Sequence, residues 1–151
     1  MRTKEIVWNE VRLCFSALSR NEAFARFAVT SLLTPLDPTV EELADLRTAV
    51  SEAVTNAIIH GYRGREGGMV RLYIKILAGR KVVIRVADDG CGIEDVELAM
   101  KPLYTTDPDG ERGGMGFPIM KSFTDRLTVR SAPGKGTVVT MTRVLSEADE
   151  A

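Results

Sequence analysis

Cysteine and histidine are scarce in this sequence, which has only two cysteines, Cys14 and Cys91, and one histidine, His60. Two thiols cannot form the disulfide framework of a small secreted domain. A Cys14–Cys91 disulfide stays open on the sequence alone, although two separate small apolar side chains fit a reduced compartment better. The chain also has no apolar run long enough to cross a bilayer and no segment that resembles a secretory signal. We therefore expect a cytoplasmic protein without a membrane partner.

A charge excess of either sign is also missing, since 20 lysines and arginines face 21 aspartates and glutamates, for a net charge of −1. No domain-wide positive field is present to hold a phosphate backbone, so direct nucleic-acid binding is not expected. The chain does have 151 residues, of which 44% are hydrophobic, and these are enough for one sizeable core. Internal repeats and Pro/Gly/Ser-rich linkers are absent, which predicts a single domain over residues 1–151.

The first third of the chain predicts one strand and one helix. Apolar and polar residues roughly alternate over residues 5–17, as in a half-buried strand. Its predicted inward-facing side chains are Val11, Leu13 and Phe15. Ser19 and Glu22 have the spacing of a capping box, which indicates a helix over about 20–33. The apolar residues at helical spacing within it are Phe24, Phe27, Ala28 and Leu32.

A second helix is predicted after the Pro35–Pro38 segment. Thr39 and Glu42 repeat the capping-box spacing, and the flexible backbone of Gly61 suits a helix end. The apolar stripe of this helix is Leu43, Leu46, Val50, Val54 and Ala57. His60 lies in its last turn, where we expect it to bond to the last carbonyl groups; direct contact with a ligand is the less favoured alternative.

Two β-hairpins are predicted beyond this helix. Residues 70–76 alternate as a strand with one buried face, and residues 78–80 turn the chain into a strand at 82–87. The weaker alternation of that second strand is typical of the middle of a sheet. A later hairpin joins residues 127–129 to the β-branched run 137–142.

Glu52 and Asn56 are the first candidate site residues. They lie four residues apart on the second predicted helix, so their side chains share one face, about 6 Å apart at Cβ. Their neighbours in sequence are small or apolar, and burying a carboxylate and an amide there is costly unless something binds them. An exposed, hydrogen-bonded helix face is the alternative. With phosphates nearby, the Asn56 amide oxygen could be one of the few protein ligands of a magnesium ion.

The second candidate is the stretch Asp88-Asp89-Gly90-Cys91-Gly92-Ile93, directly after the predicted strand at 82–87. Its glycines let a ligand approach the backbone closely. Asp88 could read adenine, because a carboxylate accepts hydrogen bonds and the base offers an exocyclic amine. The same pattern also builds ordinary tight turns, so the stretch alone does not decide the function.

The third candidate is Gly113-Gly114-Met115-Gly116, followed by a helix predicted over residues 117–123. The glycines and prolines of residues 101–116 suit a mobile lid. A helix start presents unpaired backbone N–H groups to phosphate oxygens, and Arg112 could reach a terminal phosphate. A flexible loop with a surface arginine is the alternative. A further pair, Gly136-Thr137, closes the last hairpin and carries no functional signal by itself.

Taken in order, these four pieces resemble the N, G1, G2 and G3 boxes of the GHKL superfamily, which includes gyrase, Hsp90, MutL and histidine-kinase catalytic domains. The resemblance implies an α+β fold of the Bergerat type, a two-layer sandwich in which a mixed, mainly antiparallel sheet packs against helices, with nucleotide under a mobile lid. The strings at 51–62, 102–106 and 111–117 are similar to the anti-sigma F factors of spore-forming bacteria, the stage II sporulation protein AB family. This closer resemblance runs over nearly the whole chain.

The closer resemblance implies an anti-sigma factor that binds sporulation sigma F as an ATP-loaded homodimer and phosphorylates a serine of an anti-anti-sigma factor. Glu52 would be the general base, Arg112 would stabilise the transferred phosphoryl group, and Asn56 would hold Mg²⁺. ATP or ADP would contact residues of the four boxes and the lid, namely Asn56, Asp88, Gly90, Gly92, Ile93, Thr105, Thr106, Gly113, Gly114, Met115, Gly116, Phe117 and Thr137.

The sequence departs from that family at Gly113, where a serine is usual, and it begins a few residues earlier. The glycine should loosen the lid backbone without abolishing binding. Three alternatives stay open: a switch kinase of the general-stress branch, a non-catalytic ATP-gated binding module, and a detached sensor histidine-kinase catalytic domain. The strings 58–62 and 115–120 favour the sporulation branch, and Glu52 argues against binding alone. A phosphoacceptor helix pair is absent from the sequence.

Overall fold

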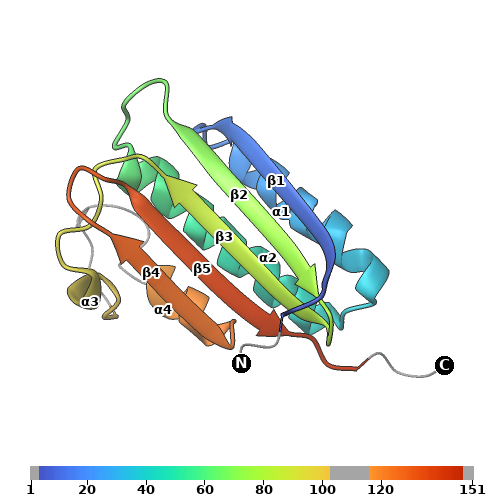
Figure 1. Cartoon of the computed structure of the whole chain (residues 1–151). Helices are drawn as coiled ribbons and strands as arrows, with labels where there is room; N and C mark the ends of the chain where they lie inside the picture. Colours follow the sequence, from blue (N-terminus) through green and yellow to red (C-terminus); the bar gives the residue numbers. More distant parts are fainter. Residues whose placement is uncertain (1–3, 103–115, 148–151) are drawn as a thin grey trace.

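Five strands form one sheet, and helices cover one of its faces, which makes a two-layer α+β sandwich (Figure 1). The structure is a computed structural model that describes residues 4–102 and 116–147. The strands are β1 (Val7–Ser16), β2 (Met69–Leu77), β3 (Lys81–Asp88), β4 (Arg126–Ser131) and β5 (Thr137–Val144). The helical elements are α1 (Asn21–Leu33), η1 (Thr34–Leu36), α2 (Val40–Thr55), η2 (Asn56–Gly61), α3 (Val96–Ala99) and α4 (Gly116–Ser122).

The strand order is β1-β2-β3-β5-β4, and every neighbouring pair of these described strands is antiparallel. The expectation of a mixed sheet is therefore wrong for this part of the chain. Short turns join β2 to β3 and β4 to β5, and such hairpin turns connect only antiparallel strands. The expected central position of the 82–87 strand is confirmed, because β3 lies between β2 and β5.

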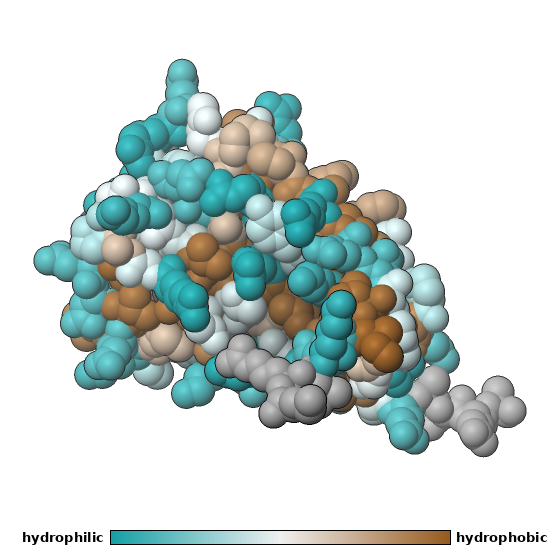
Figure 2. Space-filling model, viewed as in Figure 1, coloured by the Kyte–Doolittle hydropathy of each residue, from teal (hydrophilic) through white to brown (hydrophobic). Residues whose placement is uncertain are grey.

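The core lies between the sheet and its helices. Side chains alternate along β2 as predicted, so that Val70, Leu72, Ile74 and Ile76 are buried. On β1, Phe15 is buried, and Leu13 packs against the core from a partly buried position. In the view of Figure 1 the helices lie behind the sheet, so Figure 2 shows the uncovered sheet face. On that face hydrophilic side chains alternate with smaller hydrophobic patches (Figure 2).

Helix α1 has the expected length but a different buried face. Its buried residues are Ala25, Val29 and Leu33, whereas Phe24 and Phe27 are 50% and 72% exposed. The prediction of a stripe through the two phenylalanines is therefore wrong. Ala25, Val29 and Leu33 have the same helical spacing one residue further along, and their small or aliphatic side chains let α1 pack against α2. Phe24 instead contacts the ring of Phe15 edge-on, with ring centroids 6.3 Å apart.

The capping box expected at the start of α1 does not form. Arg20 occupies the N-cap position without a side-chain capping hydrogen bond, and the Asn21 and Glu22 N–H groups donate to the Leu18 and Ser19 carbonyls instead. The carboxylate of Glu22 is used elsewhere: it pairs with Arg26 at 2.9 Å and accepts a hydrogen bond from Ser51 on α2. Glu22 thus joins the two helices rather than capping one of them.

The capping box of α2 is confirmed. The Glu42 N–H donates to Thr39 Oγ1 at 3.0 Å, and the Thr39 N–H donates to Glu42 Oε1 at 2.9 Å. The helical path reaches Gly61 as predicted, although its last part, η2, is a π-helix with a wider turn. Both cysteines are free thiols, as favoured from the sequence. Among the described helices, none has the length and apolar character that crossing a membrane requires.

Glu42 also ties the start of α2 to the segment after β5. Its side chain is buried, and it accepts hydrogen bonds from the Ser146 N–H at 2.7 Å and from Ser146 Oγ at 3.1 Å. Burial disfavours the charged form, but the hydrogen bonds from Thr39 and Ser146 outweigh it and lower the pKa of the Glu42 carboxyl. The carboxylate form of Glu42 therefore stabilises the fold.

We predict that Glu42→Gln lowers the free energy of unfolding by about 1–3 kcal/mol at pH 7, because the amide has only one acceptor oxygen for donors that now use two. The pKa of Glu42 is lowered in the folded state, so its contribution is present above the ordinary carboxyl pKa of 4.5 and is lost as the pH falls through the folded-state value. Urea unfolding at pH 7 and pH 3 measures both effects. Glu41→Gln, which changes the exposed neighbouring carboxylate, is the control. If Glu42→Gln lowered the free energy of unfolding equally at pH 7 and pH 3, the charge of Glu42 would not be the cause.

Candidate functional site

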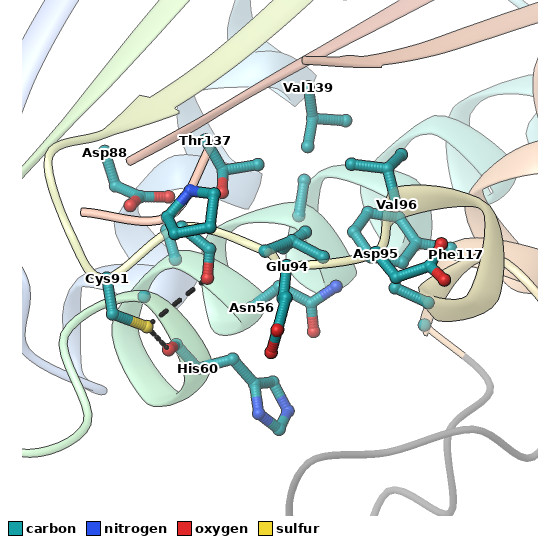
Figure 3. A pocket seen from close by; sticks show the side chains of 18 of the residues that line it. Asn56, His60, Asp88, Cys91, Glu94, Asp95, Val96, Phe117, Thr137 and Val139 are labelled. Carbon is teal, nitrogen blue, oxygen red and sulfur yellow. Dashed lines mark hydrogen bonds between the residues drawn. The ribbon is translucent and has the colours of Figure 1, made fainter. Parts of the chain in front are cut away.

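A pocket with a volume of about 980 Å³ opens beside one end of the sheet (Figure 3). Its walls come from η2, from the loop between β3 and α3, from α3 itself and from the first residues of α4. The ends of β3 and β5 complete it, with Val86 and Val139 as apolar wall residues. This volume is in the range of small-molecule and cofactor sites.

The loop after β3 is docked on the end of η2. The Cys91 N–H donates to the Gly61 carbonyl at 2.7 Å, and the Cys91 thiol donates to the His60 carbonyl at 3.2 Å (Figure 3). A Cβ on Gly90 would lie 2.1 Å from the Gly61 carbonyl oxygen, so this approach requires glycine at position 90. The two backbones therefore meet directly, with no side chain between them.

Asp88 lies at the end of β3, buried in the pocket wall. Its Oδ1 accepts a hydrogen bond from the Gly90 N–H at 2.9 Å, and a Cβ on Gly61 would lie only 2.8 Å from the same oxygen. Burial raises the pKa of the Asp88 carboxyl, although hydrogen bonds from the backbone of Gly90 and Thr137 favour its charged form. The Asp88 carboxylate thus has more acceptor sites than its backbone hydrogen bonds from Gly90 and Thr137 occupy.

The neighbouring Asp89 differs from Asp88 in its exposure, its hydrogen-bond partners and the direction of its pKa shift. It is exposed and forms a two-pronged ion pair with Arg71, with N–O distances of 2.6 and 3.1 Å. This pair lowers the pKa of the Asp89 carboxyl. Of the two adjacent carboxylates, only Asp88 lines the pocket.

Glu52, Asn56 and Gly116 meet at another part of the site. A Cβ on Gly116 would lie 3.1 Å from Asn56 Nδ2 and 3.3 Å from Glu52 Oε2, so the first residue of α4 lies against both side chains. The helical spacing did bring Glu52 and Asn56 to one face, as expected. Asn56, Gly116 and Phe117 line the pocket, whereas Glu52 lies at its edge.

The last hairpin closes the site from the β5 side. Thr137 is buried in the pocket wall, and a Cβ on Gly136 would lie 2.0 Å from the Asp88 carbonyl oxygen. Ser131 Oγ accepts from the Ile93 N–H at 2.8 Å and donates to the Gly136 carbonyl at 2.8 Å. Ser131 therefore connects the loop after β3 with the β4–β5 turn, a role that the sequence did not reveal.

The structure thus brings together the expected residues at 52–56, 88–93 and 136–137 with Gly116 and Phe117, the described part of the glycine-rich candidate. Gly92 and Ile93 line the pocket, and Gly90 lets the loop approach the Gly61 carbonyl closely. Six expected site residues, Thr105, Thr106, Arg112, Gly113, Gly114 and Met115, lie outside the described residues, as does most of the predicted lid at 101–116. Their roles stay predictions.

Several pocket residues had no assigned role in the sequence analysis, or only a less favoured one in the case of His60. Cys91 lies in the wall, and the His60 side chain extends beside the pocket opening (Figure 3). The short helix α3 was not expected, although Asp95 caps it by accepting from the Leu98 N–H at 3.0 Å. The spacing of Asp95 and Leu98 was the one available signal, and it is common in loops. Glu94 and Asp95 also line the pocket, with the Glu94 carboxylate directed toward His60 and Asp95 near Val96 and Phe117 (Figure 3).

The described residues fit a magnesium ion only in company with phosphate. They contain no group of three or more histidine, cysteine, aspartate or glutamate side chains arranged to hold a metal. The Asn56 amide oxygen and the nearby Glu52 carboxylate offer oxygen ligands beside Gly116. Mg²⁺ commonly takes one or two ligands from protein and the rest from phosphates and water. The donor set is therefore suited to a metal that arrives with a phosphorylated ligand.

Comparison with known proteins agrees with this geometry. Residues 15–143 match the family described as the histidine kinase-like ATPase domain. An anti-sigma F factor of Pasteuria penetrans is 54% identical over 138 residues, which cover 91% of each chain. An anti-sigma F factor of Thermoanaerobacter sp. (strain X514) is 51% identical over 137 residues, which cover 91% of this chain and 94% of the relative.

A solved structure has the same fold at lower identity. The RsbU and RsbW domains of Rv1364c from Mycobacterium tuberculosis match 93% of this chain with a TM-score of 0.66 and 20% identity. The match covers 33% of that longer chain. At this identity the likeness concerns the fold alone.

We predict that Asp88→Asn leaves the ligand-free protein at least as stable as the wild type at pH 7. Because the folded-state pKa of Asp88 is raised, the folded protein loses stability as the pH rises above the ordinary carboxyl pKa, and a neutral amide avoids this loss. Urea unfolding at pH 7 measures it, with Asp89→Asn as the control that breaks an exposed ion pair. A loss of more than about 1 kcal/mol in Asp88→Asn, as for an ordinary hydrogen bond, would mean that the carboxylate holds the fold together.

Proposed function

The chain belongs to the family of histidine kinase-like ATPase domains, in its anti-sigma F factor branch, and from this premise we propose that it is an ATP-dependent anti-sigma factor and a protein serine kinase. The observation that carries the proposal is the composition of the pocket. A buried, partly satisfied carboxylate lies among apolar residues in one part, and Asn56 and Gly116 line another, with Glu52 beside them at the edge. ATP has the complementary order, an adenine base followed by a triphosphate.

The base would lie against Asp88. The adenine ring is flat and apolar, which suits Val86, Val139 and Ile93, and its exocyclic amine would donate to the free acceptor capacity of the carboxylate. Removing a buried acceptor from water has a cost, and a donor on the ligand offsets it. Recognition of the amine would therefore favour adenine over bases that carry an oxygen there.

The triphosphate would lie toward Asn56 and Gly116. When bound, Mg²⁺ would be held by the Asn56 amide oxygen together with phosphate oxygens, and it would neutralise charge on the phosphates. Because Gly116 has no side chain, there is room beside Asn56 and Glu52. The lid residues Thr105, Thr106, Arg112, Gly113, Gly114 and Met115 belong to the proposed phosphate contacts by the family resemblance.

Glu52 would act as the general base. It would accept the proton of a serine hydroxyl while the serine oxygen attacks the γ-phosphorus, and ADP would leave as the bond to the β-phosphate oxygen breaks. Its place beside Asn56 and Gly116, at the edge of the pocket rather than inside it, suits a group that meets an incoming protein substrate. Arg112 would stabilise the charge on the transferred group.

The proposed partners are sporulation sigma F and an anti-anti-sigma factor whose serine is the phosphate acceptor. We propose that a homodimer of the ATP-loaded protein holds the sigma factor in the cytoplasm, away from RNA polymerase. Support comes from relatives named anti-sigma F factor that are 51–54% identical and match nearly their whole length. These names favour the sporulation branch over the general-stress branch.

We predict that Asp88→Asn weakens ATP binding at least tenfold, because the amide can present an N–H to the base amine where the carboxylate offers only acceptors. Isothermal titration calorimetry with ATP and Mg²⁺ measures the affinity. Asp89→Asn, one residue further on but outside the pocket, is the matched control and should bind ATP as the wild type does. Wild-type affinity in Asp88→Asn would show that the base lies elsewhere.

We predict that Glu52→Gln reduces phosphoryl transfer to the anti-anti-sigma factor by about 10²-fold or more, since the proton acceptor is removed while the shape is kept. Binding of ATP and of sigma F should persist, because sequestration needs the folded, ATP-loaded protein but not the base. Mass spectrometry of the acceptor protein and a sigma F pull-down on the same preparation test both points.

The phosphorylation measurement and the sigma F pull-down also distinguish a kinase from a non-catalytic binding module. A variant that still transfers phosphate at the wild-type rate would remove Glu52 as the base. A wild-type protein that binds ATP and sigma F but phosphorylates no acceptor would instead be a non-catalytic, ATP-gated binding module.

A further inference from the structure

Tyr62 is a buried phenol that follows η2 directly and forms two hydrogen bonds through its hydroxyl group. The hydroxyl donates to the Met69 carbonyl at 2.5 Å and accepts from the Asp89 N–H at 2.9 Å. Its ring packs closely on Gly68, where a Cβ would lie 2.7 Å from the ring carbons. The ring and the hydroxyl are therefore held on several sides.

These bonds join three segments of the chain. Tyr62 belongs to the end of the helix that carries Asn56, Met69 begins β2, and Asp89 is the residue after Asp88. The hydroxyl thus fixes the distance between the helix end and the peptide unit that follows Asp88. The packing of Asp88 against Gly61 depends on that same distance.

Tyr62 does not line the large pocket formed by the described residues. It lies beside a smaller hollow that Gly68, Met69 and Asp89 also line. The hydroxyl reaches the site through its hydrogen bond from the Asp89 N–H, which lies next to Asp88 in the chain. By contrast, Asn56 and Gly116 are held by helix geometry that the hydroxyl does not contact.

We propose that the Tyr62 hydroxyl is a positioning group that aims the Asp88 carboxylate at the exocyclic amine of adenine, and that it thereby sets the base specificity of the pocket. The inference rests on the proposed nucleotide site. Loss of the hydroxyl frees the Asp89 peptide from its anchor and lets Asp88 move, so contact with the base weakens while contact with the phosphates persists.

The test compares ATP with inosine triphosphate, which carries a carbonyl oxygen in place of the adenine amine. Calorimetry gives the dissociation constants of both nucleotides, with Mg²⁺, for the wild type and Tyr62→Phe. Tyr73→Phe is the matched control, because that tyrosine lies on β2 with its ring beside the Arg12 guanidinium, on the uncovered sheet face. We expect the wild type to prefer ATP by tenfold or more.

In Tyr62→Phe we expect ATP affinity to fall by about 3- to 10-fold, the effect of one ordinary hydrogen bond, with little change for inosine triphosphate. The ratio of the two affinities should narrow accordingly, and Tyr73→Phe should keep the wild-type ratio. Equal loss for both nucleotides, or an unchanged ratio, would overturn the proposal and leave Tyr62 a purely structural residue.

A second variant keeps the test decisive if Tyr62→Phe does not fold. Gly68→Ala retains the hydroxyl but displaces the ring through its added methyl group, so it should narrow the same ratio. A wild-type ratio in folded Gly68→Ala would overturn the proposal. A wild type that binds neither nucleotide, or binds both equally, would refute the proposed base site itself, which distinguishes that failure from the failure of the role of Tyr62.

Discussion

The site depends on the direct contact between two backbones, where the loop after β3 meets the end of η2. Any side chain at position 90 would overlap the Gly61 carbonyl oxygen, so glycine there lets the Cys91 N–H reach that oxygen at 2.7 Å. The contact places Asp88, at the end of the central strand β3, against the helix that carries Glu52 and Asn56. A carboxylate from the sheet and the Asn56 amide from a helix thus line one pocket, with the Glu52 carboxylate at its edge.

Of two buried carboxylates, Glu42 stabilises the fold, and Asp88 is suited to recognise a ligand. Glu42 has its acceptors filled by Thr39 and Ser146, so its charge stabilises the fold and its pKa is lowered. Asp88 is left with unfilled acceptor capacity, and burial raises its pKa. The buried charge of Asp88, which lowers the stability of the fold, is the one suited to recognise a hydrogen-bond donor on a ligand.

Side-chain periodicity predicted β2, β3, the capping box of α2 and the shared face of Glu52 and Asn56, because each depends on local spacing. It failed for α1, where Phe24 and Phe27 resembled a core stripe, while the approach of α2 favoured the smaller Ala25 and Val29. The π-helical turn of η2, the short helix α3 and the link through Ser131 depend on contacts between distant segments. Local pattern has no signal for such contacts, and so it gave no role to Cys91, although this wall residue lies within the candidate stretch after β3.

The most direct measurement is a crystal structure of the protein with Mg²⁺ and a non-hydrolysable ATP analogue. We expect the base amine within hydrogen-bond distance of the Asp88 carboxylate, with the triphosphate next to Asn56 and Gly116 and the metal on the Asn56 amide oxygen. A nucleotide bound outside this pocket, or bound with its phosphates at Asp88 and its base at Asn56, would contradict this expectation.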